Sequence, residues 1–261
     1  MGANLAELDT AIREGDFNLI DKYIEEFQRT ISRLRYARKP VVVAVHQRIL
    51  GGGCELLMAC PNPVASAESY IGLVELGVGL IPAGTGSMTF AALASERSAS
   101  SHPSEIQSWL RHFFETVAMS SVSTSAEDAK HMGFLPPHAT IVMHDERRLH
   151  VAREEALRLS SEGYFPPPVR RHITVLGRPS GAALDVMVRQ YLEGGFITEY
   201  DAYLAGRLAY VMTGGPLTGP QEVDEEYLIH LEREVFMELV RQKKTQERIE
   251  YMLQTRKPLR N

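Results

Sequence analysis

The feature that most constrains the fold is a turn of three glycines between an apolar run and a segment compatible with a helix. Residues 41–45 read VVVAV, a continuous run typical of a strand that is covered on both faces. Gly51, Gly52 and Gly53 follow, and residues 54–60 read CELLMAC. The first N–H groups of a helix have no intrahelical partner and point outward with the positive end of the helix dipole. This order of elements predicts a strand-to-helix turn that presents backbone N–H groups to a ligand.

Two ligands suit such a turn, a phosphate group and a carbonyl oxygen that gains negative charge during a reaction. The phosphate alternative is weak, because residues 49–57 fit neither GxGxxG nor GxxxxGK[ST] and no lysine follows the glycines. Glu55 would also repel a phosphate. An oxyanion hole is favoured, since its N–H groups stabilise an enolate oxygen while Glu55 moves protons near the adjacent carbons. Glycine-rich turns with a nearby glutamate also occur without catalysis, so these residues alone leave a structural role open.

The pattern along the chain indicates two portions. Apolar residues at steps of three or four predict an amphipathic helix over 16–37. Ser125 as N-cap and Gly133 just past the last turn predict a short helix, and residues 138–143 predict one more strand. Further helices are predicted at 145–162, 180–193, 198–213, 221–240 and 242–255. The prediction is an α/β portion over 1–143 followed by an α-helical portion over 144–261.

The composition argues against several classes of protein. The formal net charge is −5 with both signs mixed, so the basic footprint of nucleic-acid binding is missing. Cys54 and Cys60 lie in apolar sequence without metal-ligand spacing, which predicts buried thiols of a reducing compartment and no metal site. No apolar run approaches the ~18 residues of a membrane span. The N-terminal segment MGANLAELDTAIREGD lacks the apolar region of a signal peptide, so the prediction is a soluble cytoplasmic protein.

Longer stretches extend the glycine–glutamate motif. KPVVVAVHQRILGGGCELLMAC (39–60) is followed by SYIGLVELGVGLIPAGTG (69–86) and TSAEDAKHMGFL (124–135). Together they resemble the crotonase superfamily, specifically the enoyl-CoA hydratases, over about residues 1–143. SSEGYFPPP (160–168), the segment from GGFITEY to VMTGG, and the ending KKTQERIEYMLQTRKPLRN are similar to the C-terminal end of bacterial β-oxidation proteins. Those proteins fuse a 3-hydroxyacyl-CoA dehydrogenase to an enoyl-CoA hydratase.

The resemblance implies an α/β core of the crotonase type, a ββα spiral at 1–143, followed by the helical region. At the matching motif positions, Glu55 and Glu75 would be the two catalytic glutamates, and the backbone N–H groups of Gly52 and Ala3 would form the oxyanion hole. Further substrate contacts are implied at Gly2, Gly51, Gly53 and Pro82. The substrate would be an acyl-CoA thioester, with no resident cofactor or metal. NAD would serve only the dehydrogenase part of a fusion.

The presence of both glutamates bears on the implied reaction. Hydratases resemble this arrangement, whereas isomerases of the family typically keep only the second glutamate. The implied reaction is the hydration of a trans-2-enoyl-CoA in fatty acid β-oxidation, with one water held between Glu55 and Glu75. One carboxylate accepts the proton of the water as oxygen adds to Cβ, and the other, by resemblance Glu75, delivers a proton to Cα. Two carboxylates in one dry pocket cannot both ionise easily, so one pKa is predicted to be raised.

The N-terminus is where the chain departs from the family pattern. MGANL matches a VGANL-like motif, so Ala3 stands at the third residue, whereas family members carry a further strand-rich stretch before it. A core that is incomplete at its N-terminus, with weak or no activity for the chain alone, is therefore expected. A non-catalytic truncated crotonase-like module and an enoyl-CoA isomerase stay open as alternatives. The expected partner is an acyl-CoA thioester, with self-association or docking to a dehydrogenase domain as options, and neither nucleic acid nor a membrane.

Two other polar features have competing interpretations. His46 stands where hydratases commonly carry Asn, and a hydrogen-bonded structural role is favoured over a catalytic base. Lys243, Lys244 and Arg248 form a basic stretch near the C-terminus. A solvated helix face is the favoured interpretation of this stretch, with docking against a partner domain or the CoA phosphates as the alternative.

Overall fold

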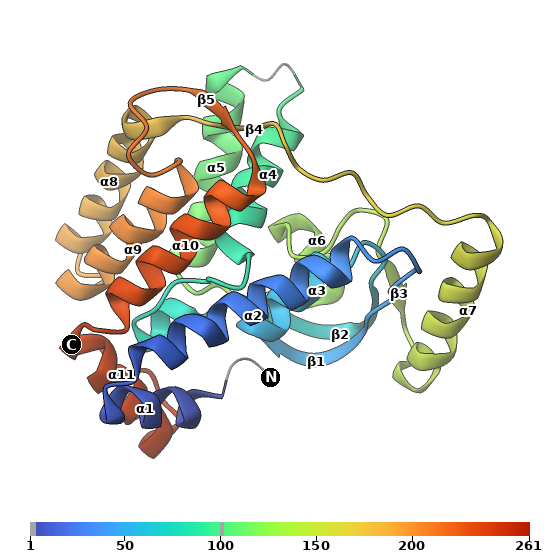
Figure 1. Cartoon of the computed structure of the whole chain (residues 1–261), viewed down its shortest axis with the longest axis horizontal. Coiled ribbons are helices and arrows are strands. Elements are labelled where there is room, and N and C mark those ends of the chain that lie inside the picture. The colour runs from blue at the N-terminus through green and yellow to red at the C-terminus, as the bar shows by residue number, and fades with distance from the viewer. Residues whose placement is uncertain (1–3, 100–101) are drawn as a thin grey trace.

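A parallel sheet of three strands, in the order β1-β2-β3, organises the first part of the chain (Figure 1). The computed structural model describes residues 4–99 and 102–261. The strands of this sheet are β1 (Ala44–Leu50), β2 (Val64–Gly72) and β3 (Thr140–Val142). β2 is the central strand, and its register with β1 shifts at a bulge between Val45 and Gln47. A second, antiparallel sheet pairs β4 (Ile173–Val175) with β5 (Gln221–Val223).

Helices make up most of the remaining described residues. They are α1 (Leu5–Glu14), α2 (Phe17–Arg35), α3 (Gly52–Ala59), α4 (Gly86–Arg97), α5 (Pro103–Ala118), α6 (Ala126–Met132), α7 (Arg148–Ser161), α8 (Gly177–Glu193), α9 (Glu199–Met212), α10 (Glu225–Leu239) and α11 (Lys243–Thr255). Two short 3₁₀ helices are η1 (Glu75–Val78) and η2 (Asp145–Arg147). Within these described ranges no helix is both long enough and apolar enough to cross a membrane.

Local sequence signals explain the helices that the sequence predicts. The Asp16 carboxylate accepts a hydrogen bond from the Leu19 N–H and begins α2, the amphipathic helix predicted over 16–37. Ser125 accepts from the Asp128 N–H, and Gly133 closes α6 in the left-handed region at φ 89°. Both caps of this short helix are as predicted, because each depends only on neighbouring residues.

Three boundaries differ from the prediction. The strand predicted at 41–45 begins at Ala44 and continues to Leu50, directly before the glycines. The helix predicted from residue 180 begins at Gly177. The segment 221–223, predicted as the start of a helix, is instead β5. This strand is three residues long and is fixed by pairing with β4, about 50 residues earlier in the chain, so the local pattern of residues gives no sign of it.

One hydrophobic core joins the two portions of the chain. Leu57 and Phe90 from the α/β portion and Leu208 and Leu239 from the helical portion are completely buried in it. Figure 1 shows α8, α9 and α10 side by side at the left and the parallel sheet at the right, with α7 beyond the sheet. The segment between α7 and β4 crosses from one side to the other, while α1 lies beside α11. The division at residue 143 stays a prediction.

Candidate active site

A cavity of about 980 Å³ lies between α1, α2 and the loops that follow β1 and β2. This volume is at the upper end of the range of about 300–1,000 Å³ that is usual for small-molecule sites. Most of its wall is apolar, and Glu55 and Glu75 are among the few ionisable side chains that line it. Apolar lining residues include Leu8, Ile20, Ile24, Phe27, Ile81, Phe236 and Met252. An apolar ligand of substantial size, with one reactive group near the two carboxyls, fits this cavity.

The glycine turn lies in the wall of this cavity. Gly51 adopts φ 58° and ψ −133°, a backbone conformation that residues with a Cβ rarely adopt, and its N–H donates to the Gly72 carbonyl at 3.0 Å. Gly52 is the first residue of α3, and both Gly51 and Gly52 line the cavity. The N–H groups in the first turn of a helix have no intrahelical acceptor. The glycine turn therefore places one such backbone donor, the Gly52 N–H, at the cavity wall.

Glu55 follows on α3 and is 3% exposed. Its Oε1 atom accepts two hydrogen bonds, from the Gly84 N–H at 2.7 Å and from the Gly86 N–H at 2.9 Å. Burial raises the pKa of Glu55 from 4.5 to about 7, while the two backbone N–H groups act in the opposite direction. A carboxyl with this pKa can give or take a proton near neutral pH.

Glu75 is the first residue of η1, directly after Val74. Its Oε2 atom is buried and makes no hydrogen bond within the described part of the chain. Burial, and then the charge of Glu55, raises the pKa of Glu75 well above its usual range. The pKa of the Cys54 thiol is also raised, by burial and then by Glu75 and Glu55, so all three groups are within electrostatic reach of each other.

The two carboxyls therefore have different surroundings on one cavity. Backbone N–H groups act to lower the pKa of both carboxyls, but only the pKa of Glu75 is also raised by the charge of its neighbour, and Oε2 of Glu75 makes no hydrogen bond in the described chain. This difference separates a base from an acid in the way that paired titratable groups do in acid–base enzymes. It also confirms the prediction that sharing the pocket raises at least one pKa.

Comparison with known proteins finds similar sequences and folds. A family model described as enoyl-CoA hydratase/isomerase matches residues 3–102. Over these residues the chain is similar to this family. Two crystal structures show the fold: an enoyl-CoA hydratase from Bacillus halodurans (TM-score 0.53) and an enoyl-CoA hydratase/isomerase from Mycobacterium paratuberculosis (TM-score 0.55), each 14% identical. The two superpositions cover 95% and 96% of this chain, and 75% and 74% of the respective crystal structures. The predicted α/β fold of the crotonase type is confirmed.

Longer curated relatives match as well. A probable 3-hydroxyacyl-CoA dehydrogenase of Bacillus subtilis is 38% identical over all 261 residues of this chain, which is 32% of that protein. A putative fatty acid oxidation complex trifunctional enzyme of Rickettsia felis is 27% identical over 248 residues, 95% of this chain and 31% of that protein. The chain thus spans about a third of the length of these relatives.

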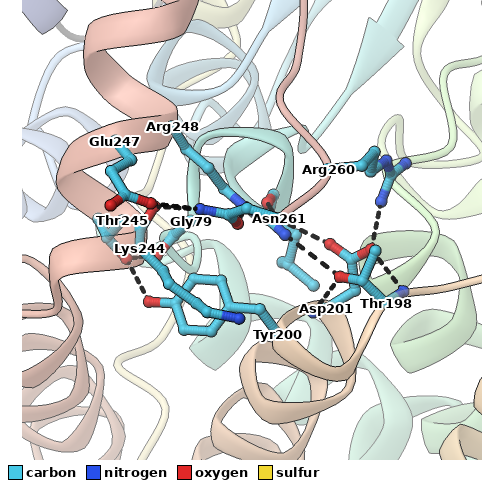
Figure 2. Close-up of polar contacts among 11 residues, drawn as sticks. Gly79, Thr198, Tyr200, Asp201, Lys244, Thr245, Glu247, Arg248, Arg260 and Asn261 are labelled. Atoms are coloured by element: carbon cyan, nitrogen blue, oxygen red, sulfur yellow. Dashed lines mark hydrogen bonds and ion pairs between the residues drawn. The ribbon is translucent and has the colours of Figure 1, made fainter.

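Helix α11 of the helical portion contacts η1, the 3₁₀ helix that carries Glu75, and Figure 2 shows Thr245 and Arg248 of α11 beside Gly79, which follows η1. Arg248 on α11 donates from Nη1 to the Leu76 carbonyl of η1 at 3.2 Å, and Thr245 Oγ1 donates to the Gly79 carbonyl at 2.6 Å. The guanidinium of Arg248 also lies 5.0 Å from the centre of the Tyr200 ring. The 3₁₀ helix that carries Glu75 is therefore fixed at two carbonyls by one helix from the end of the chain.

Arg248 corrects an interpretation of the sequence. A solvated face was expected for Lys243, Lys244 and Arg248, yet the Arg248 side chain is completely buried and forms an ion pair with Asp201. A helix face in which three basic residues lie close together looks solvated in the sequence. Arg248 nevertheless faces inward, because α11 packs that side against η1 and α9.

Gly53 and Pro82, two predicted substrate contacts, are not among the described residues that line the cavity. Ala3 and Gly2 lie outside the described residues, so the second oxyanion donor stays a prediction. Gly53 follows Gly52 in α3, and the Pro82 carbonyl accepts a hydrogen bond from Ser87 Oγ at 2.7 Å beside the cavity. His46 lies on β1 with its side chain 42% exposed and Nδ1 3.8 Å from Asp145, which is longer than a hydrogen bond, so its structural role stays a prediction.

Glu232 is a buried carboxyl near the site that the sequence analysis missed. It lies on α10 and is completely buried. A signal for it exists in the sequence, because Glu232 stands at the helical spacing of Leu228 and Val235, which are both in the core. A charged residue on the apolar face of a helix indicates a specific polar partner.

Proposed function

We propose that this chain is an enoyl-CoA hydratase module, which adds water across the double bond of a trans-2-enoyl-CoA and gives a 3-hydroxyacyl-CoA. The observation that carries the proposal is the pair of Glu55 and Glu75 on one apolar cavity, one with two N–H donors and one with an unpartnered oxygen among the described residues. Hydratases of the family have both glutamates. The apolar wall suits the acyl chain of such a substrate.

The proposed reaction uses the difference between the two carboxyls. Glu55 keeps Oε1 on its backbone donors, which leaves Oε2 to orient a water molecule and accept its proton as the oxygen adds to Cβ. Glu75, whose pKa lies well above its usual range, carries a proton and delivers it to Cα. The Gly52 N–H at the start of α3 stabilises the enolate oxygen of the thioester in the transition state. No resident cofactor takes part in this reaction.

A neighbouring dehydrogenase activity is part of the proposal. The Bacillus subtilis relative is named a probable 3-hydroxyacyl-CoA dehydrogenase, and this chain corresponds to about a third of it. We infer that the product of hydration, a 3-hydroxyacyl thioester, is passed to a dehydrogenase domain that docks on the helical portion. The name of the Rickettsia felis relative, a putative fatty acid oxidation complex trifunctional enzyme, supports a role in fatty acid β-oxidation. A cytoplasmic location stays a prediction from the sequence.

The test is a hydration assay with crotonyl-CoA, followed by the loss of absorbance of the conjugated thioester. The substitutions Glu55→Gln and Glu75→Gln are each expected to lower kcat by about 10²–10⁴-fold, the usual range for an acid–base group. Glu222→Gln, at a side chain that is 63% exposed on β5, serves as control and leaves kcat unchanged. A preparation that includes any residues encoded in frame upstream is assayed in parallel.

Two outcomes contradict the proposal. No turnover in either preparation supports a non-catalytic module. Conversion of a 3-enoyl-CoA to the 2-enoyl isomer, without hydration and unaffected by Glu55→Gln, supports an isomerase, because isomerases of the family typically keep only the second glutamate.

A further inference from the structure

A second carboxylate binds the same segment as Glu55, residues 83–88, which comprises the end of the loop before α4 and the first turn of α4 and is called the loop. Glu232 accepts a hydrogen bond at Oε2 from the Thr85 N–H at 2.9 Å and another at Oε1 from the Met88 N–H at 2.6 Å. The whole side chain is buried, so each lost hydrogen bond would leave a buried group without a partner. Glu232 is not among the residues that line the cavity in the described chain, so it does not contact a ligand bound there.

The two glutamates bind alternating residues of the loop. The N–H groups of Gly84 and Gly86 point to Oε1 of Glu55, and the N–H group of the residue between them, Thr85, points to Glu232. Because neighbouring N–H groups bind different carboxyls, each hydrogen bond restricts the rotation of its own peptide plane and of the next one. The position of the Glu55 donors therefore depends on Glu232 as well as on Glu55.

Thr85 has a backbone conformation that needs such support. Its φ is 82° and its ψ is 6°, in the left-handed region, which is an outlier for a β-branched residue. Strained backbone of this kind costs about 1–3 kcal/mol and persists only where the surroundings fix it. The hydrogen bond from the Thr85 N–H to Glu232 is a contact of this residue that can fix it.

The loop is also tied to the helix that carries Glu232. Gln28 on α2 is 4% exposed and donates from Nε2 to the Ala83 carbonyl at 2.7 Å and to the Ile229 carbonyl at 3.1 Å. Ile229 lies on α10, one turn before Glu232. The start of the loop and α10 are thus held together independently of Glu232, which leaves the orientation of Thr85 as the specific task of the carboxylate.

We propose that Glu232 is a positioning residue of the site: by binding Thr85 and Met88 it holds the loop so that the Gly84 and Gly86 N–H groups converge on Glu55. The consequence for catalysis rests on the proposed hydratase function, whereas the positioning of the two N–H groups does not. The helical portion of the chain then contributes to the geometry of the glutamate that orients the water.

A carboxylate suits this task better than an amide. Each of the two oxygens of Glu232 accepts one N–H, whereas an amide has only one oxygen. In Glu232→Gln the NH₂ group would face the N–H of either Thr85 or Met88. Glu55 differs, because both of its backbone donors point to one oxygen, Oε1, which Gln retains. Glu55→Gln therefore keeps the loop bound and serves as a matched comparison.

The first test is amide hydrogen exchange measured by NMR, which needs no enzymatic activity. In Glu232→Gln the Gly84 and Gly86 N–H groups are expected to exchange at least tenfold faster than in wild type, with amides in the cores of α5 and α9 unchanged. Addition of Thr85→Gly is expected to restore much of the protection, because glycine adopts the left-handed conformation without strain. Glu225→Gln is the control: Glu225 is a buried carboxylate on the same helix, bound to Tyr36 Oη at 2.6 Å.

The second test is steady-state hydration of crotonyl-CoA. Glu232→Gln is expected to lower kcat at least tenfold with KM changed less than threefold, and Thr85→Gly in the same chain is expected to recover part of kcat. Glu225→Gln is expected to lower stability without this loss. If Glu232→Gln fails to fold, Glu232→Asp, which withdraws the carboxylate by one methylene, is measured in the same way.

The outcomes separate the two proposals. Unchanged exchange at Gly84 and Gly86 in Glu232→Gln, or an equal acceleration in Glu225→Gln, overturns the positioning role. Faster exchange at the two glycines with unchanged kcat overturns its catalytic consequence. Faster exchange in a protein whose wild type hydrates no enoyl-CoA supports the positioning role and contradicts the proposed hydratase function.

Discussion

Arg248 and Asp201 form a buried ion pair, in which Arg248 Nη1 lies 2.7 Å from Asp201 Oδ1. The Arg248 side chain is not exposed at all and that of Asp201 is 6% exposed. Asp201 also completes a capping box with Thr198 at the start of α9, and its second oxygen lies 2.7 Å from Arg260 Nη1 (Figure 2). The pair thus joins α9 and α11 behind the 3₁₀ helix that carries Glu75.

The ion pair leads to a prediction about stability. Arg248→Met would remove the buried donor to the Leu76 carbonyl and to Oδ1 of Asp201. Oδ2 of Asp201 would keep its contacts with the Thr198 N–H and Arg260. Removal of one partner of a buried pair typically costs about 3–5 kcal/mol, since the other charge stays buried. We expect a loss of this size in the free energy of unfolding, measured by urea denaturation.

The control for this prediction is an exposed pair. Arg153 is 69% exposed and its Nη1 lies 2.6 Å from Glu154. Arg153→Met is expected to change the free energy of unfolding by less than about 1 kcal/mol, because surface ion pairs contribute little. Equal losses in the two variants would show that Arg248 acts only as a surface residue does.

The raised pKa of Glu55 predicts that stability depends on pH. Between pH 4.5 and about 7 the folded chain holds a proton on Glu55 that the unfolded chain releases. The stabilisation is therefore complete below pH 4.5 and is lost as pH rises to about 7, by up to about 3 kcal/mol. Glu75 and Glu232 act in the same direction, since burial raises the pKa of each.

Glu55→Gln isolates this contribution, because the amide keeps both backbone hydrogen bonds and does not titrate. We expect the free energy of unfolding of the variant to fall less steeply than that of wild type as pH rises through this window. Urea denaturation at several pH values measures both curves. Parallel curves would contradict the assignment of the raised pKa to Glu55.

The two cysteines provide a test of the core around α3. Cys54 and Cys60 are 0% and 2% exposed, and burial raises the pKa of Cys54 well above its usual range and that of Cys60 to about 11. Thiols react as thiolates, so the native chain is expected to react with DTNB at least about 10²-fold more slowly than the unfolded chain. Rapid reaction of one thiol in the native protein would show that α3 opens readily.

The parts of the fold that sequence analysis could predict depend on neighbouring residues. The caps at Ser125 and Gly133 and the apolar spacing of α2 are local, and the structure has both helices where they are predicted. Glu55 and Glu75 came from a motif, and the structure brings both to one cavity. β4 and β5 could not be predicted, because each is stabilised by the other across about 50 residues.

The positions of charged groups inside the molecule were the hardest to predict. Arg248 lies in a segment of charged residues, and only the packing of α11 determines that it faces Asp201. Glu232 lies on the apolar face of α10, and its partners are backbone N–H groups of a loop about 145 residues earlier. Nearly every residue has a backbone N–H group. The sequence therefore does not indicate which of these groups bind the Glu232 carboxyl.

The loop that binds Glu55 has no room for an additional side-chain atom at Gly84. A Cβ there would lie 2.3 Å from Phe27 Cε1 and 2.6 Å from Glu55 Oε2. Gly84→Ala is therefore expected to displace Glu55 and to cost about 1–3 kcal/mol in the free energy of unfolding through overpacking. Because a shift of about 1 Å in a reacting group can cost about 10²-fold in rate, kcat for crotonyl-CoA hydration is expected to fall by that order.

Gly219→Ala is the matched control, because a Cβ at Gly219 meets no atom within 4 Å and its φ is not positive. We expect this variant to stay within about 0.5 kcal/mol of wild type in unfolding free energy and to keep its kcat. A Gly84→Ala variant with the stability and kcat of Gly219→Ala would mean that the loop moves without disturbing Glu55. In that case the hydrogen bonds from Gly84 and Gly86 would not be what holds the carboxylate in place.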